Sequence, residues 1–217
     1  MNPPSITAYT GTSVQQFAVE GSFWITQTPT PGTGVSVTTA TQVAFGATAP
    51  AFLIRNTAAA GGKDIIIKRL RLIVVGTGLG LTSLESLCVV DSTNRYSSGG
   101  VLMTAYNAKA DEASASIAQI YNASTAIVAT AAGASARPVT RHKVKAAAPV
   151  VSDTFVTAYA SEPAAVGEPL TGTAATLYAQ GSAPLIVPPQ ATGLIYLWAP
   201  AMTTAPTFEI QIEHVER

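Results

Sequence analysis

Short runs of β-branched and aromatic residues, separated by Gly, Pro, Thr and Asn, recur along this chain. Many such runs with turn residues between them are typical of the strands of a β-sandwich or barrel. An all-β chain of 217 residues is commonly one domain. We therefore predict an all-β fold, a single antiparallel β-sandwich of jelly-roll type over residues 1–217, with a flexible N-terminal arm at about residues 1–13. Strands are expected at residues 23–27, 34–39, 41–45, 51–56, 64–75, 86–90, 153–159, 184–188, 193–199 and 207–215.

The most apolar run, residues 64–75, contains two arginines, Arg69 and Arg71. Because side chains alternate between the two faces of a strand, both arginines are expected to point the same way. Strict alternation gives the same face to Ile65 and Ile67. At about 3.3 Å per residue, a run of this length crosses a whole sheet or bends between two.

The C-terminal run, residues 207–215, alternates apolar side chains with polar ones, among them Glu209 and Glu213. This pattern predicts a half-buried strand with one solvated face. Glu209 and Glu213 share one strand face, as Arg69 and Arg71 do, so cross-strand ion pairs are one interpretation of the arginines. The other is a subunit interface, where Arg is enriched.

Residues 104–132 leave two interpretations open. Between Tyr106 and Tyr121 the apolar residues stand at helical intervals, which predicts a short helix around residues 107–122. An Ala-rich strand with a loop is the alternative. Pro138 and the small residues before it end any helix in this part of the chain.

Charged residues make up 11% of the chain, and its twelve basic and twelve acidic residues cancel. A neutral chain without a basic tail lacks the clustered charge that attracts nucleic acid, so no direct nucleic-acid contact is expected. No stretch approaches the roughly 20 apolar residues of a membrane-spanning helix, and the N-terminus lacks the features of a secretory signal. We expect no membrane contact and synthesis in a cytoplasm. Because interface cores are depleted in charge, the composition favours an assembly component over a Thr- and Ser-coated monomer.

Motifs of known enzymes are not found in the sequence, and we predict no enzymatic activity, cofactor or metal. The single cysteine, Cys88, is flanked by Leu and Val, which favours a buried apolar role over a reactive thiol. A hydrolase that uses His142 or His214 is the remaining enzymatic hypothesis. Asp91 and Asn94 offer oxygens that a cation accepts, but these residue types also form turns unaided, and a turn is favoured.

One basic cluster stands out, at residues 137–145. Docking on an acidic partner surface is one interpretation, since charge steers encounter and register. A solvated loop is an equal alternative. Contact with nucleic acid ranks third, because no aromatic residues are interleaved. The cluster consists of Arg137, Arg141, His142, Lys143 and Lys145.

Two segments together resemble structural proteins of tailed bacteriophages. The first is "PAFLIRNTAAAGGKDIIIKRLRLIVVGTG", within residues 50–80: a short strand ending in Asn, a small-residue turn with Gly-Lys, then a long apolar strand. The second is "PLIVPPQATGLIYLWAPAMTTAPTFEIQIEHVER", residues 184–217: a Val-Pro-Pro turn, a strand, a small-residue loop and an alternating final strand.

The resemblance implies a β-sandwich of jelly-roll type on the virion, made in the host cytoplasm. We expect a capsid cement or decoration protein that binds the outer shell, bridges capsid subunits and forms a homotrimer, with the major capsid protein or another virion protein as partner. The alternative is a receptor- or glycan-binding fibre or tail module. No functional residues carry over from the resemblance. Aromatic residues for a glycan-stacking platform would be Tyr9, Trp24, Tyr96, Tyr106, Tyr121, Tyr159, Tyr178 and Trp198.

Overall fold

The computed structural model describes residues 13–28, 30–36, 44–78, 80, 83–145, 148–159 and 177–217. The predicted N-terminal arm lies, except for Ser13, outside these residues, as do parts of the strands expected at 34–39 and 41–45. The elements are α1 (Ser13–Val19), β1 (Phe23–Gln27), β2 (Val35–Ser36), β3 (Phe52–Asn56), β4 (Ile65–Gly76), β5 (Leu84–Asp91), β6 (Tyr96–Met103), β7 (Ala105–Asn107), β8 (Ala118–Ala129), β9 (Arg137–Lys145), β10 (Thr154–Tyr159), β11 (Leu177–Ser182), β12 (Leu185–Val187), β13 (Thr192–Trp198) and β14 (Thr207–Glu216).

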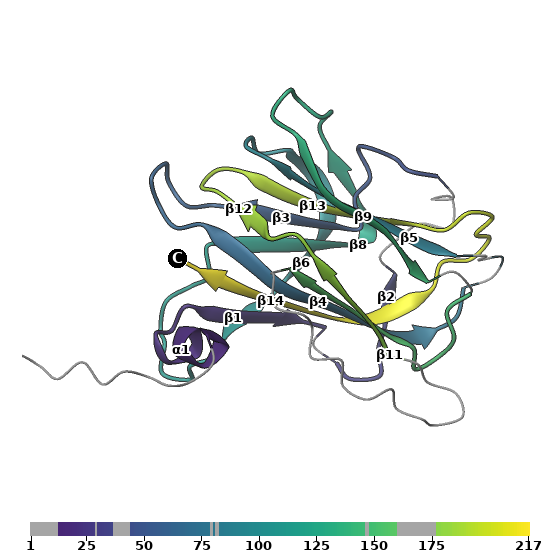
Figure 1. The fold of residues 1–217 in the computed structure, drawn as a ribbon, viewed down its shortest axis with the longest axis horizontal. Coiled ribbons are helices and arrows are strands. Elements are labelled where there is room, and N and C mark those ends of the chain that lie inside the picture. The colour runs from purple at the N-terminus through teal and green to yellow at the C-terminus, as the bar shows by residue number, and fades with distance from the viewer. Residues whose placement is uncertain are drawn as a thin grey trace, which may run out of the picture.

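The strands form two sheets that pack face to face (Figure 1). Sheet A has the order β11-β10-β4-β14-β1-β7, with β12 also on β4 and β2 also on β14. Sheet B has the order β6-β8-β3-β13-β5-β9. All pairs are antiparallel except β10 with β11. The prediction of an all-β, mostly antiparallel sandwich is therefore confirmed.

The helix predicted around residues 107–122 is wrong. The chain leaves β7 at Asn107, turns, and enters β8 at Ala118. Along β8, Ala118, Ile120 and Asn122 are buried in alternation, and the strand pairs with β3 on one side and β6 on the other. Two ladders of hydrogen bonds and burial of Ile120 outweigh the helical spacing, because tertiary context overrides weak local propensity.

The described helix is α1, which the sequence did not predict. It lies beside sheet A at the end where the chain terminates (Figure 1). The Lys68 ammonium lies 5.5 Å from the centroid of the Phe17 ring of α1, and the Arg217 guanidinium lies 5.4 Å from it. These cation–π contacts tie the helix to β4 and to the C-terminus, and each contributes about 0.5–1 kcal/mol at an exposed site.

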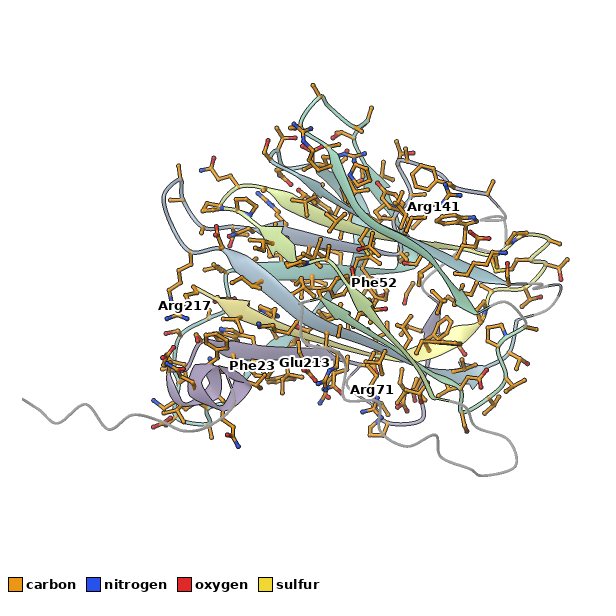
Figure 2. The ribbon with its side chains drawn as sticks, in the orientation of Figure 1. Phe23, Phe52, Arg71, Arg141, Glu213 and Arg217 are labelled. Carbon is orange, nitrogen blue, oxygen red and sulfur yellow. The ribbon has the colours of Figure 1, made fainter. Side chains whose placement is uncertain are left out.

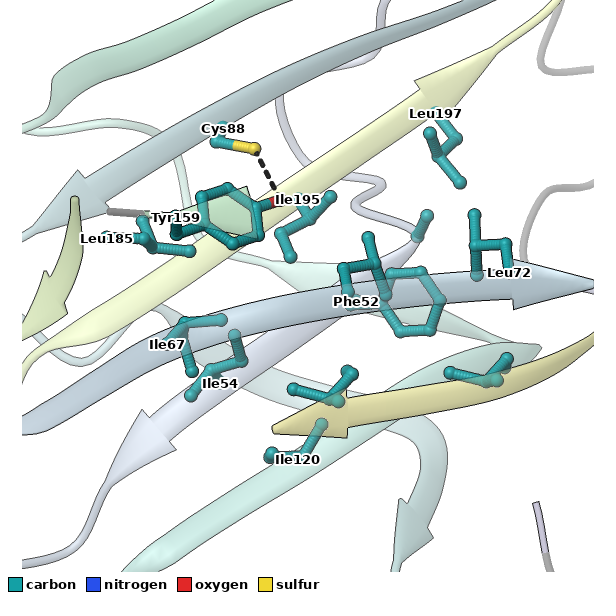
Figure 3. Packing of buried hydrophobic residues seen from close by; sticks show 14 of the residues in the cluster. Phe52, Ile54, Ile67, Leu72, Cys88, Ile120, Tyr159, Leu185, Ile195 and Leu197 are labelled. Atoms are coloured by element: carbon teal, nitrogen blue, oxygen red, sulfur yellow. Dashed lines mark hydrogen bonds between the residues drawn. The ribbon is translucent and has the colours of Figure 1, made fainter. Parts of the chain in front are cut away.

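The main core lies between the sheets (Figure 3). Phe52 and Ile54 reach it from β3, Ile67 and Leu72 from β4, and Ile195 from β13, and all are essentially inaccessible to solvent. Burial of one such side chain contributes about 1.5–3 kcal/mol relative to exposure. The predicted strands at 51–56, 64–75, 86–90, 153–159, 184–188, 193–199 and 207–215 supply most of this core as β3, β4, β5, β10, β12, β13 and β14.

A second apolar cluster covers part of the outer face of sheet B. It includes Leu194, Tyr196 and Trp198 from β13. The segment before β3 closes over them: the Phe45 ring meets Tyr196 edge-on at 4.9 Å and Trp198 at 5.7 Å, and the Tyr196 hydroxyl donates to the Ala47 carbonyl at 2.9 Å. This face of sheet B therefore carries a small core of its own.

Strand β4 contains a β-bulge that changes which side chains are buried. Glu213 of β14 pairs with Arg69, but the next residue, His214, pairs with Ile67, so Lys68 has no opposite residue. The extra residue switches the alternation, and Ile65 and Ile67 enter the core. The expectation that these two isoleucines share the face of Arg69 is wrong.

Candidate functional site

The predicted basic cluster lies on β9, an edge strand of sheet B. Arg137, Arg141 and Lys143 are exposed. Lys143 Nζ lies 3.8 Å from Glu85 Oε1 on β5, and Arg137 Nη1 donates to the Ala134 carbonyl at 2.7 Å. Charges on an edge strand discourage pairing with the edge of another sheet. Docking through this cluster stays a prediction, and the side chains of His142 and Lys145 lie outside the description.

Arg69 and Arg71 point to the outer face of sheet A, as expected from their spacing. The Arg69 Nη1 lies 3.4 Å from Glu213 Oε1, directly across the ladder. Arg71 faces Gln211 instead. Since half of the Arg69 side chain is exposed, the ion pair contributes no more than about 1 kcal/mol. Because the arginines are two residues apart and the glutamates four, one antiparallel register places a glutamate opposite only one arginine.

Glu209, the second predicted partner, lies opposite Ile73 and accepts a hydrogen bond from the backbone N–H of Gly32. It lines a cavity of about 130 Å³ together with Arg71. Figure 2 shows Arg71 and Arg141 on opposite sides of the molecule. The two groups of predicted site residues therefore belong to different surfaces and do not form one site.

His214 belongs to a buried polar cluster with Ser116 and Glu216. The imidazole is fully buried, and its Nε2 lies 3.4 Å from both Ser116 Oγ and Glu216 Oε1. The Nδ1 has no hydrogen-bond partner. A serine–histidine–acid relay needs the serine at one imidazole nitrogen and the acid at the other. Both groups here meet the same nitrogen, so the cluster lacks relay geometry.

Glu216 joins the end of β14 to the start of β8. Its Oε1 accepts hydrogen bonds from the Ser116 hydroxyl, from the Ile117 N–H at 2.9 Å and from the Ala118 N–H at 3.3 Å. Burial alone would raise the pKa of this carboxyl group, but the hydrogen bonds and His214 outweigh burial and hold its pKa below the ordinary value. The carboxylate therefore acts as a structural clamp between the two sheets.

Cys88 lies in the main core, as the sequence predicts. Its Sγ is 3.2 Å from the Tyr159 hydroxyl (Figure 3). Burial raises the pKa of the thiol to about 11. A nucleophilic cysteine needs a lowered pKa and access to solvent, and Cys88 has neither.

The segment "DSTNR" forms a turn built on Asp91. This carboxylate accepts hydrogen bonds from the Thr93 N–H at 3.1 Å and from the Ser135 hydroxyl, and lies 3.8 Å from Arg95 Nε. Burial would raise the pKa of Asp91, but these donors and Arg95 lower it below the ordinary value. Asn94 Oδ1 accepts a hydrogen bond from the Tyr96 N–H at 3.1 Å, and the buried Asp91 Oδ2, which has no hydrogen-bond partner among the described residues, faces the Arg95 guanidinium. Among the described residues, no group of three or more His, Cys, Asp or Glu side chains is placed to hold a metal ion.

Arg95 is buried and was not singled out from the sequence. Its guanidinium donates to the Thr130 carbonyl at 2.6 and 2.9 Å and to the Ala47 carbonyl at 3.0 Å. It thus joins the β5–β6 turn to the segment that covers Tyr196. Arg95 follows Asp91 by four residues, a spacing that indicates an ion pair in a helix. In a turn the same spacing indicates nothing, so the contact could not be predicted from the sequence.

The proposed aromatic platform is not formed by the described residues. Trp24, Tyr159 and Trp198 are buried. Tyr96 stacks on Tyr121 with ring centroids 4.4 Å apart. Tyr106 alone among the described members is largely exposed, and Tyr9 and the Tyr178 side chain lie outside the description.

An apolar groove lies where the edges of the two sheets meet. Strands β6 and β7, which end sheet B and sheet A respectively, are separated by the single residue Thr104. Val101, Leu102 and Tyr106 are 44%, 54% and 56% exposed there. They line a cavity of about 330 Å³ whose lining holds no charged residue, and we call it the edge groove.

No known protein family, curated protein or solved structure matches the chain. Among the residues that the structure describes, no helix has the length and apolar character needed to cross a membrane.

Proposed function

We propose that this protein is a virion structural protein of the capsid cement or decoration class, which binds the outer shell as a homotrimer and bridges capsid subunits. The virion assignment rests on the resemblance of residues 50–80 and 184–217 to tailed-bacteriophage proteins. These segments supply β4 and β14 at the centre of sheet A, β3 and β13 at the centre of sheet B, and the short strand β12 that pairs with β4. The resemblance therefore concerns the framework of the sandwich and not its surface loops.

The edge groove is the observation that supports self-association. Among the described residues, β6 and β7 have a strand partner on one side only, and they lie beside three exposed apolar side chains, a combination that a second copy of the chain covers. The lining is uncharged, as the centre of a subunit interface is. A partner docked through complementary charges would need charges here, and a second copy with the same uncharged surface does not.

Light scattering after size-exclusion chromatography tests this step. Each chain has a mass of 22.2 kDa, and we expect the mass of three chains at low and at high salt, because an uncharged interface is insensitive to screening. Leu102→Glu places a charge in the groove and is expected to give single chains. Val151→Glu, at an equally exposed valine outside the groove, is the matched control and is expected to remain a trimer.

A wild-type monomer at both salt concentrations, or a Leu102→Glu variant that keeps the wild-type mass, would contradict self-association through the groove. The virion assignment has a separate test. The chain is expected among the peptides of purified particles from cells that carry its gene, with immunogold label on the shell. Its absence from such particles would overturn the assignment even if the trimer forms.

A further inference from the structure

A polar pocket of about 500 Å³ lies at the end of the sandwich, beside the turn that Asp91 and Arg95 hold in place. Three connections meet there: the loop after β3, the turn between β5 and β6, and the turn between β12 and β13. The pocket shares no lining residue with the edge groove. Its volume is within the roughly 300–1,000 Å³ of small-molecule sites. Polar lining residues include Arg55, Ser92, Asn94 and Gln190, of which Asn94 already accepts a hydrogen bond from the Tyr96 N–H through its Oδ1.

Among the described residues of the lining, Arg55 alone is charged. It stands on the outer face of sheet B, half-buried, and its Nη1 donates to Gln119 Oε1 at 3.4 Å. No described carboxylate forms an ion pair with it, and nearby Asp91 is already engaged by Arg95. A guanidinium has five N–H donors in a planar fork that fits a carboxylate, and most of this fork is open.

Gln190 stands at a position that usually belongs to glycine. The Ala191 N–H donates to the Pro188 carbonyl at 3.1 Å, which closes a turn around Pro189 and Gln190. Gln190 has φ of 62°, as the third residue of a type II turn requires, and Gly or Asn is favoured there. The chain thus keeps an amide side chain at the pocket at a conformational cost that glycine would remove.

We propose that this pocket binds a small carboxylate-bearing sugar, of the uronic or sialic acid class. The Arg55 fork holds the carboxylate, while the Asn94 and Gln190 amides and the Ser92 hydroxyl exchange hydrogen bonds with the sugar hydroxyls. A single cation matches one negative charge, whereas a polyphosphate calls for several. The lining has no aromatic side chain on which a nucleobase would stack. The inference goes beyond the proposed virion role and does not depend on trimer formation.

Titration calorimetry and amide chemical-shift mapping with the methyl glycoside of glucuronic acid and with N-acetylneuraminic acid test the proposal. The methyl glycoside of glucose is the uncharged control ligand, and inorganic phosphate is the sugar-free anion. We expect an acidic sugar to bind at least about tenfold more tightly than methyl glucoside or phosphate, with shifts confined to the pocket. Arg55→Gln is expected to weaken binding about tenfold or more, because a charge-assisted bidentate contact is lost.

Gln190→Gly separates a loss of binding from a loss of stability. It removes the side-chain amide from the pocket, and it places glycine at a positive φ that glycine adopts without strain. It is expected to weaken binding several-fold with an unchanged or higher midpoint of thermal unfolding. Arg71→Gln is the matched control. It removes the same charge from sheet A, in the cavity that Arg71 shares with Glu209, and is expected to bind the sugar like wild type. Equal binding of glucoside and glucuronide, binding of phosphate as tight as that of the sugars, full affinity in Arg55→Gln, or no binding in the millimolar range would each overturn the proposal.

Discussion

At the scale of single residues, the buried charged side chains described above hold distant segments together by hydrogen bonds and have a structural role. Asp91, Arg95 and Glu216 each connect segments that are far apart in sequence. A buried charge costs several kcal/mol unless it is paired and hydrogen-bonded, so such groups are retained only where their partners are fixed. The sheets themselves fix these partners, because Glu216 ends β14 directly beside the start of β8.

Glu216→Gln tests the clamp and its pH dependence. The pKa of Glu216 in the folded chain lies below the 4.5 of a free glutamate, so its carboxylate stabilises the fold above about that pH, and this contribution is lost as the pH falls through the folded pKa. We expect the variant to lose about 1–3 kcal/mol of unfolding free energy near neutral pH, where charged acceptors are replaced by an amide. The difference from wild type is expected to shrink as the pH falls through the folded pKa of Glu216, because the wild-type carboxylate is then protonated.

Urea unfolding at several pH values measures both effects. Glu20→Gln, the same change on the exposed α1 end, is the control and is expected to alter stability little at any pH. A deficit of Glu216→Gln that is equally large in acid and at neutral pH would show that the lost stability does not come from the charge of the carboxylate.

At the scale of elements, the strands with the densest β-branched residues could be predicted, and those whose structure depends on distant partners could not. β1, β3, β4 and β14 follow from local pattern and turn residues. β6, "YSSGGVLM", reads as a loop because of Gly99 and Gly100. Both have positive φ and pass so close to β8 that a Cβ at Gly99 would collide with the Ala126 carbonyl. β6 is a strand because it pairs with β8. The residues of β8 lie further along the chain, so the sequence around β6 alone does not predict this pairing.

The candidate sites were predictable to a similar extent. The common face of Arg69 and Arg71 follows from alternation, and the pairing of Arg69 with Glu213 was one of two interpretations offered. With Glu213 opposite Arg69, Gln211 necessarily stands opposite Arg71, whereas the bulge at Lys68, which buries Ile65 and Ile67, has no local signal. The edge groove and the polar pocket combine residues from several strands and loops, so neither was visible in the sequence.

A pair of alanine substitutions tests the bulge. Strict alternation would bury Ile66 with Leu70 and Leu72, whereas the bulge buries Ile67 and leaves Ile66 partly exposed. We expect Ile67→Ala to cost about 2–5 kcal/mol of unfolding free energy, because it leaves a cavity in the main core. Ile66→Ala is expected to cost about 1 kcal/mol, the loss of partial burial. Chemical denaturation of both variants gives the comparison, and a larger cost at Ile66 would place the bulge elsewhere.

At the scale of the whole molecule, the sandwich divides its surface by chemistry. The outer face of sheet A carries the Arg69–Glu213 ion pair, the β9 edge of sheet B carries exposed cations, and the side where β6 meets β7 carries the uncharged edge groove. Cations discourage edge-to-edge pairing at β9, whereas the described residues of β6 and β7 carry no charge. The molecule is therefore asymmetric, and in the proposed cyclic trimer the edge groove of each copy would meet a different surface of the next copy.

This asymmetry predicts a thermal stability that depends on protein concentration. If folding and trimer formation are linked, a tenfold rise in concentration stabilises each chain by two thirds of RT ln 10, about 0.9 kcal/mol. For a chain of this length we expect the unfolding midpoint to rise by about 2–4 °C per tenfold increase. Calorimetric scans over two decades of concentration measure this slope for wild type and for Val151→Glu. Leu102→Glu is expected to show none, and a wild-type midpoint that is independent of concentration would mean that the edge groove contributes no association energy.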